Sequence, residues 1–360
     1  MTTGAIEREK VHRLFHSLDM LRGLAALSVV GLHLNGQIAE WMPSSYLAVD
    51  LFFVLSGFVI AHAYQVRFDQ GLSFRTFMRM RIVRLYPLYI AGTFATGATV
   101  ALISMVQGKQ IDSFAFSASM AFAILFLPTP RSLSSDGFHV FPFNFPAWSL
   151  CWEIAVNALY ALVAKRLSNM LLAVLVTIGA FLLLSAVMLY GNLGGGSNFR
   201  TFGSAPLRVV FSFFAGVAVY RVWMSDRFPH VRMNPILSAV LLLAIFMIPA
   251  GRHPLFDLGA VMIVFPLLVF ATTREPASPH VQRVFTALGL SSYPVYALHA
   301  AFLRFEGIAA GKLERHASSA LLPFEITFLA LMMAVGIAAD IYYDKPVRMW
   351  LAARFPKADR

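Results

Sequence analysis

The sequence predicts an all-α polytopic membrane protein with about ten transmembrane helices, one short re-entrant or interfacial helix, and both termini in the cytoplasm. Of the 360 residues, 58% are hydrophobic and only 13% are charged, whereas a soluble domain carries about 25% charged residues. The mean hydropathy is +0.69. A chain of this composition has too few charged side chains to cover a surface in water. Most of its apolar stretches also approach the roughly 20 residues that a helix needs to span a bilayer.

Ten apolar stretches are predicted to cross the membrane. They lie at residues 18–39, 46–66, 85–106, 147–164, 170–190, 205–223, 235–250, 256–272, 286–306 and 320–342. A further stretch, 115–128, is shorter and ends in LPTP. Loops rich in Lys and Arg belong on the cytoplasmic side by the positive-inside rule, and these assignments agree only if 115–128 does not cross. The chain then divides into a cytoplasmic segment at 1–17, a membrane domain at 18–343 and a basic cytoplasmic tail at 344–360.

The net charge of +11 raises the question of a nucleic-acid partner. In so apolar a chain, cytoplasmic loops and anionic lipid headgroups account for the excess of Lys and Arg. We therefore expect membrane lipids as partners, no nucleic acid and no metal, and a homo-oligomer stays open. Cys151 is the single cysteine, so the chain has no internal disulfide.

Two ionisable residues lie within the first predicted span. Arg22 and His33 are eleven residues apart, so they share one face of a helix, roughly 16 Å apart along its axis. An ionisable group in hydrocarbon costs several kcal/mol unless it is paired or faces a wet interior. Asp50, Glu153 and His299 fall at a depth similar to that of His33. Either carboxylate could hold one imidazole nitrogen of His33 as a donor and leave the other free to act as a general base.

A second group of ionisable residues is predicted on the cytoplasmic side. Arg81 and Arg84 are three residues apart, so they project to one side of a helix. Paired guanidinium groups suit phosphate, which they can bind bidentately. Arg22 emerges on the same side. A phosphorylated ligand inside and a base near the outer leaflet suggest transfer of a group across the bilayer.

Five motifs, in order over about residues 16–350, resemble the acyltransferase 3 family of integral membrane acyltransferases. They are LRGLAALSVVGLH with Arg22 and His33, VDLFFVLSGFVI with Asp50 and 56–58, RIVRLYPLY with Arg81 and Arg84, AWSLCWE with 148–153, and SSYPVYALH with Tyr293 and His299. The sequence departs from the family pattern at Val156 and Asn157, where aromatic residues are frequent, and at Asp344, where Glu is usual.

The resemblance implies an O-acyltransferase of the bacterial inner membrane. Its donor would be an acyl-CoA, usually acetyl-CoA, bound from the cytoplasm, and no cofactor would be permanently bound. The acceptor would be a hydroxyl of a glycan or another molecule at the outer face. We assign the site residues as follows: catalytic His33, Asp50 and Glu153; donor-binding Arg22, Arg81 and Arg84; site-lining Trp148, Ser149, Tyr293 and His299.

Other interpretations stay open. A proton-coupled secondary transporter or a flippase would also need buried ionisable groups, but the chain shows no inverted repeat and the arginine pair has no role in such a carrier. Residue by residue, Arg22 could snorkel to the headgroups, and Arg81 and Arg84 could serve only as topology anchors. Asp50 and Glu153 could be packing or capping carboxylates.

Overall fold

The computed structural model describes residues 15–225, 233–249, 254–273, 276 and 278–354. Within these ranges the chain forms helices and no named β-strand, and one isolated bridge joins His139 to Asn198. The prediction of an all-α protein is confirmed. The segments 1–14 and 355–360, which belong to the predicted cytoplasmic ends, lie outside the described residues.

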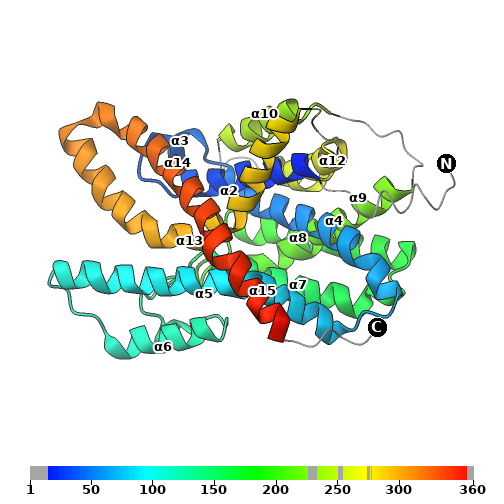
Figure 1. The fold of residues 1–360 in the computed structure, drawn as a ribbon, viewed down its shortest axis with the longest axis horizontal. Coiled ribbons are helices and arrows are strands. Elements are labelled where there is room, and N and C mark those ends of the chain that lie inside the picture. The colour runs from blue at the N-terminus through cyan, green and yellow to red at the C-terminus, as the bar shows by residue number, and fades with distance from the viewer. Residues whose placement is uncertain (1–14, 226–232, 250–253, 274–275, 277, 355–360) are drawn as a thin grey trace.

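The helices follow one another along the chain (Figure 1). They are α2 (His16–Leu32), α3 (Gln37–Trp41), α4 (Ala48–Asp69), α5 (Phe74–Val106), α6 (Ser113–Ile124), α7 (Ala147–Val163), α8 (Asn169–Tyr190), α9 (Ser204–Met224), α10 (Pro235–Met247), α11 (Pro254–Gly259), α12 (Phe265–Ala271), α13 (Pro279–His316), α14 (Leu321–Ala339) and α15 (Lys345–Arg354). Two π-helical segments, Ala260–Val264 and Asp340–Asp344, join α11 to α12 and α14 to α15. Short 3-10 turns lie at Ser45–Leu47, Arg131–Leu133, Ala164–Arg166 and Ser318–Ala320.

A helix lies at each of the ten predicted spans. In the described part of the chain, seven helical segments are long and apolar enough to cross a membrane: Ser45–Asp69, Phe74–Val106, Ala147–Arg166, Asn169–Tyr190, Ser204–Met224, Pro254–Ala271 and Ser318–Arg354. The other three helices are α2 with 17 residues, α10 with 13, and α13, whose 38 residues include several charges. The chain is therefore built as a multi-pass membrane protein, while the count of ten crossings stays a prediction.

The short apolar stretch predicted not to cross forms α6. Its 12 residues extend about 18 Å, which is less than the roughly 30 Å of a hydrocarbon core. α6 lies alongside α5 (Figure 1). The hydroxyl groups of Tyr86 and Tyr89 on α5 donate to the carbonyl oxygens of Ile124 and Ala123, at 2.7 and 2.8 Å. α5 therefore holds α6 in place, whatever its depth in the membrane.

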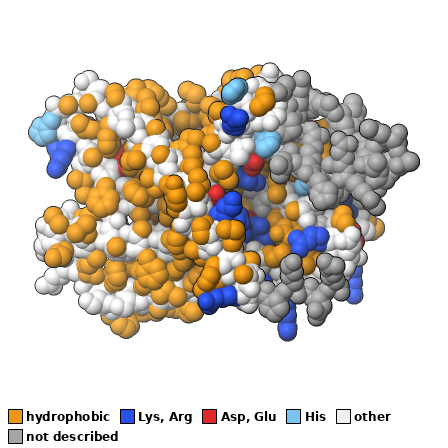
Figure 2. Space-filling view, in the orientation of Figure 1, with side chains coloured by type: hydrophobic (Ala, Val, Ile, Leu, Met, Phe, Trp, Pro, Cys, Tyr) orange, Lys and Arg blue, Asp and Glu red, His pale blue; other side chains and the backbone are white. Residues whose placement is uncertain are grey.

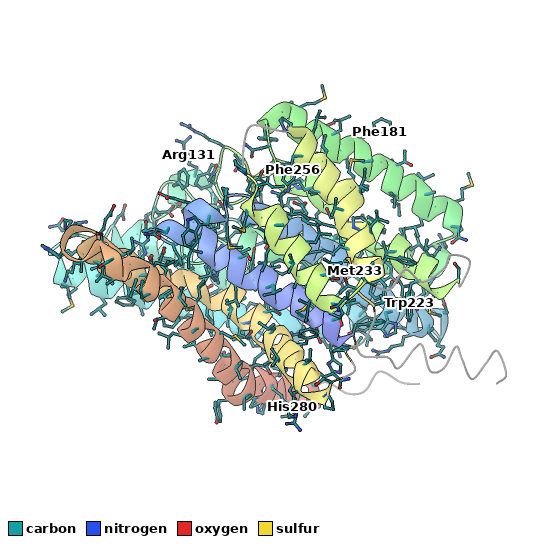
Figure 3. All side chains as sticks on the ribbon, turned by 90° about the horizontal axis from the view of Figure 1, so that it is seen from above. Arg131, Phe181, Trp223, Met233, Phe256 and His280 are labelled. Carbon is teal, nitrogen blue, oxygen red and sulfur yellow. The ribbon has the colours of Figure 1, made fainter. Side chains whose placement is uncertain are left out.

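Two helix pairs set the frame of the bundle. α2 packs along α13, and α4 packs along α9, so that α2 and α4 lie between the α8–α9 pair and the α13–α14 hairpin (Figure 3). Glycines allow the contact between α4 and α9: a Cβ on Gly57 would lie 1.9 Å from the carbonyl oxygen of Phe213, and one on Gly216 would lie 2.0 Å from that of Val54. Small residues bring membrane helices into backbone contact in this way, which fixes α4 in place as one wall of the site described below.

Large hydrophobic side chains cover much of the surface. Figure 2 shows them over most of the face in view, with Lys and Arg gathered toward its middle and one side. On α8, Phe181 is 67% exposed and points away from the bundle (Figure 3). A soluble monomer seldom exposes apolar patches of this extent, whereas a lipid environment requires them.

Candidate active site

A cavity of about 190 Å³ lies where five helices meet. α2 supplies Arg22, α5 supplies Arg81 and Arg84, and α7 supplies Glu153. The other lining residues are apolar, aromatic or hydroxyl-bearing: Val49, Phe52, Phe53, Ser56, Val59, Ile60, Leu85, Ser149, Leu150, Ser292, Tyr293 and Tyr296. Side chains from five separate stretches of the sequence thus converge on one space.

The three arginines predicted to bind the donor all line this cavity. Arg81 and Arg84 project to the same side of α5, as their spacing predicts. Each arginine has a carboxylate neighbour: Arg81 pairs with Glu153 at 2.8 Å, while Arg84 pairs with Asp344 at 3.0 Å and Arg22 with Asp19 at 3.2 Å. The lining of the cavity contains three guanidinium groups and one carboxylate, that of Glu153, so the cavity is basic.

An aromatic side chain also holds Arg84. The guanidinium carbon of Arg84 lies 5.1 Å from the centre of the Tyr293 ring, a distance at which a cation is attracted to the ring. The Tyr293 hydroxyl donates to the carbonyl oxygen of Leu85. Tyr293 therefore fixes the position of Arg84 from α13, and it lines the cavity, while its part in an active site stays a prediction.

Neither predicted carboxylate is bonded to His33. Glu153 accepts hydrogen bonds from Arg81 at 2.8 Å and from the Ser56 hydroxyl at 3.2 Å. Asp50 is fully buried and accepts from Arg208 at 2.5 and 3.4 Å. The prediction that one of these carboxylates orients the His33 ring is therefore wrong. The helix packing brings Arg81 of α5 within hydrogen-bond distance of Glu153, and Arg208 of α9 within hydrogen-bond distance of Asp50.

Arg208 is a buried charged residue near the cavity that the sequence analysis did not single out. Its side chain is 1% exposed and also donates to the carbonyl oxygen of Gly195 at 2.7 Å. The Trp148 ring lies 5.6 Å from its guanidinium carbon, so Trp148 covers Arg208 and does not line the cavity. A signal was present, because Arg208 is an arginine inside a predicted span, and such a residue needs a partner.

His33 follows the last residue of α2 and is exposed. Its ring stacks on that of His299, with centres 5.8 Å apart and planes at 15°, and meets the edge of Phe145 at 4.8 Å. Between Arg22 and His33, the side chains of Ala26 and Val29 are buried in the helix packing. The shared face therefore packs against neighbouring helices, and Arg22 and His33 open into different spaces.

His299 lies next to both His33 and Tyr296, with ring centres 5.8 and 5.9 Å away. Its side chain is fully buried, and its Nδ1 lies 2.9 Å from the carbonyl oxygen of Tyr296. A carbonyl only accepts, so Nδ1 carries the proton and Nε2 holds a lone pair. Tyr296 lines the cavity one helical turn away, and its hydroxyl shares a 2.7 Å hydrogen bond with that of Ser149. Tyr296 thus borders both the cavity and His299.

A carboxylate–histidine pair that the sequence analysis missed lies next to His33. In the α6–α7 loop, Nδ1 of His139 is 2.7 Å from a carboxylate oxygen of Asp136. The ring of His139 is 5.4 Å from that of Phe145, which also contacts His33. No group of three or more His, Cys, Asp or Glu side chains within the described ranges is arranged to hold a metal ion.

Comparison with known proteins places the chain among acyltransferases. Residues 15–344 match the family model described as acyltransferase domain, which is nearly the whole chain. Protein 2 in the picA locus of Rhizobium radiobacter is 37% identical over 182 residues, which are 48% of this chain and 94% of that protein. No solved structure gives a significant match.

Two further relatives carry names for an activity. YrhL of Bacillus subtilis (strain 168), named as a candidate peptidoglycan O-acetyltransferase, is 30% identical over 243 residues, which are 64% of this chain and 37% of YrhL. A protein of Staphylococcus aureus (strain COL), named as a candidate O-acetyltransferase, is 22% identical over 329 residues, which are 84% of this chain and 53% of that protein. The chain thus spans about a third to a half of the length of these two relatives.

Proposed function

We propose that this chain, which belongs to the acyltransferase 3 family, is an O-acetyltransferase like the relatives named for that activity. It would move the acetyl group of cytoplasmic acetyl-CoA to a hydroxyl of a glycan at the outer face of the membrane. The observation that supports this most is the adjacency of a basic cavity and a histidine cluster, with Tyr296 next to both. Transfer between two membrane faces needs a donor site and an acceptor site that meet in this way. The transporter and the flippase are not proposed, because the family is one of acyltransferases.

The cavity suits the acyl end of the donor. Its volume of about 190 Å³ is below the roughly 300–1,000 Å³ of pockets that enclose a whole drug-sized ligand. We therefore place the slender arm of the donor inside the cavity, its thioester at the Tyr296 end, which lies nearest the histidines, and its phosphate groups at Arg22, Arg81 and Arg84. Guanidinium groups bind phosphate oxygens through charge-assisted hydrogen bonds. The phosphates would compete with Glu153 and Asp344 for these arginines.

His33 is proposed as the general base. It takes the proton of the acceptor hydroxyl as that oxygen attacks the thioester carbonyl carbon. The carbon–oxygen bond forms, the carbon–sulfur bond breaks, and the proton passes from the imidazolium to the departing thiolate, which leaves as free CoA. A positioned base typically contributes about 10²–10⁴-fold to such a step. In this chain the stacked His299 ring and the edge of Phe145 hold the imidazole of His33 in place.

The test is a comparison of two histidine variants in the purified full-length protein in lipid vesicles. Acetyl-CoA labelled in the acetyl group is supplied with a soluble N-acetylglucosamine tetramer, and labelled glycan is measured. His33→Gln should lose about 100-fold or more in turnover and keep its affinity for acetyl-CoA. His316→Gln, the same change at an exposed histidine at the end of α13, should stay near wild type. Turnover of a folded His33→Gln protein within about tenfold of wild type would contradict the role of His33.

A further inference from the structure

The pair Asp136–His139 is held in a fixed geometry by its own loop. One oxygen of Asp136 accepts from the backbone N–H groups of Phe138 and His139, both at 2.9 Å, and from the Ser134 hydroxyl at 3.0 Å. The other oxygen faces Nδ1 of His139 at 2.7 Å. Three donors other than the ring therefore hold the carboxylate of Asp136 in position beside His139.

The loop is also fastened to a second loop. The N–H of Val140 donates to the carbonyl oxygen of Ser197 at 3.0 Å, and the N–H of Phe199 donates to that of Phe138 at 3.3 Å. These bonds flank the bridge between His139 and Asn198. The segment that precedes α9 thus binds the backbone of the α6–α7 loop on both sides of His139 along the chain.

The place of His139 connects it to the acceptor side of the reaction. Phe145 lies at the centre of three imidazole rings, with its own ring centre 4.8 Å from that of His33, 5.4 Å from that of His139 and 5.7 Å from that of His299. His33 is exposed, and the side chain of His139 is 27% exposed. His299 lies beneath them and is fully buried. A molecule that approaches His33 from outside the bundle therefore meets His139 and Phe145.

The chemistry of the Asp136–His139 pair determines which ring nitrogen of His139 can bind an approaching acceptor. Burial disfavours the charged form of Asp136, but the hydrogen bonds from the His139 side chain and from the N–H groups of Phe138 and His139 outweigh this effect and lower the pKa of Asp136 to about 2. The carboxylate is ionised near neutral pH and only accepts, so Nδ1 of neutral His139 carries the proton. Nε2 then presents a lone pair that can accept a hydrogen bond from a hydroxyl.

We propose that His139, oriented by Asp136, is a specificity-determining residue that accepts a hydrogen bond from a second hydroxyl of the acceptor while His33 takes the proton of the reacting one. Phe145 offers an apolar face between the two histidines. The acceptor class that fits is a sugar or another molecule that carries several hydroxyls. This inference rests on the proposed function and adds the residue that selects the acceptor.

The experiment separates positioning from folding by measuring acceptor KM and kcat independently. The full-length protein in lipid vesicles is given saturating acetyl-CoA and one of two acceptors, the N-acetylglucosamine tetramer or cyclohexanol, which has a single hydroxyl. His139→Gln and Asp136→Asn should each raise the KM for the tetramer by about tenfold and change kcat less than threefold. Neither variant should change the KM for acetyl-CoA or the weak reaction with cyclohexanol.

Arg131→Gln, an exposed change in the same loop (Figure 3), serves as the matched control and should leave the KM for both acceptors unchanged. The proposal is overturned if folded His139→Gln protein keeps the wild-type KM for the tetramer, or if wild-type protein acetylates cyclohexanol as well as it does the tetramer. A wild-type protein that transfers acetyl groups to neither acceptor would overturn the proposed function itself, which is a distinguishable result.

Discussion

Neutralising Asp50 should destabilise the packing of α4 against α9. In Asp50→Asn, the guanidinium of Arg208 loses its counter-ion while it stays in place with 1% of its side chain exposed. Two hydrogen bonds, at 2.5 and 3.4 Å, change from charge-assisted to neutral. Only the carbonyl oxygen of Gly195, at 2.7 Å, still accepts fully from Arg208.

The size of the effect follows from the burial of both partners. Breaking a buried ion pair by removing one partner costs about 3–5 kcal/mol, because the other charge remains desolvated and unpaired. Replacing a buried ion pair by well-packed hydrophobic residues of similar volume is often neutral or stabilising, and a pair of neutral amides likewise leaves no charge unpaired. The double variant Asp50→Asn, Arg208→Gln should therefore recover most of the loss, so the effects of the two single changes should be far from additive in the double-mutant cycle.

The assay is thermal unfolding in detergent, paired with acetyl transfer to the N-acetylglucosamine tetramer. Asp50→Asn should lower the apparent Tm by several degrees, and the double variant should return it toward wild type. Asp69→Asn is the matched control on the same helix, and because Asp69 is exposed it should change the free energy of unfolding by no more than about 0.5 kcal/mol.

Two results would refute this reasoning about Asp50. The first is an Asp50→Asn protein that unfolds like wild type, which would mean that the pair is not buried as described. The second is a double variant that regains the wild-type Tm but transfers no acetyl group, which would return Asp50 to the catalytic role that the sequence analysis assigned to it.

Three further predictions concern the donor, the topology and pH. Arg84→Lys keeps the charge beside Asp344 but loses the planar fork, so it should raise the KM for acetyl-CoA several-fold at unchanged Tm; an unchanged KM would make Arg84 a structural partner only. In a cysteine-free background, a single cysteine at Ser135 should react with an impermeant thiol reagent in intact cells, and one at Ser225 only after permeabilisation; the opposite pattern would refute the predicted topology. Because the pKa of Asp136 is lowered to about 2, its stabilisation of the α6–α7 loop is complete above the ordinary Asp pKa near 3.8 and is lost as pH falls toward 2. Cleavage of this loop by pepsin should therefore rise between pH 4 and pH 2 in wild type, whereas in Asp136→Asn it should already be fast at pH 4; equal cleavage of both proteins at pH 4 would contradict this.

The sequence predicted well those features that depend on neighbours along the chain. Hydropathy located the seven described helical segments that are long and apolar enough to cross a membrane, because burial in lipid demands a run of apolar residues of a set length. The short length of the stretch at 115–128 set α6 apart. Spacing placed Arg81 and Arg84 on one side of α5, and the cavity brings both together with Arg22. Their role in donor binding stays a prediction.

Contacts between distant segments were not predictable in the same way. A position in a span fixes the depth of a side chain but not the direction in which its helix is turned or which helix lies opposite. Asp50, Glu153 and His33 share a depth, yet Asp50 meets Arg208 from α9 and Glu153 meets Arg81 from α5. The carboxylate–histidine pair of this region is instead Asp136 with His139, which lies in a loop without helical periodicity.

The sequence by itself determined the class of the protein and the places of its helices, because both follow from local composition and spacing. Only the tertiary structure decided which charges are paired, that Tyr296 borders both the arginine-lined cavity and His299, and that His33, His139 and His299 surround Phe145. The physical reason is that a buried charge takes whichever partner the helix packing brings within reach. That packing is set by close backbone contacts such as those at Gly57 and Gly216, which join segments more than 150 residues apart.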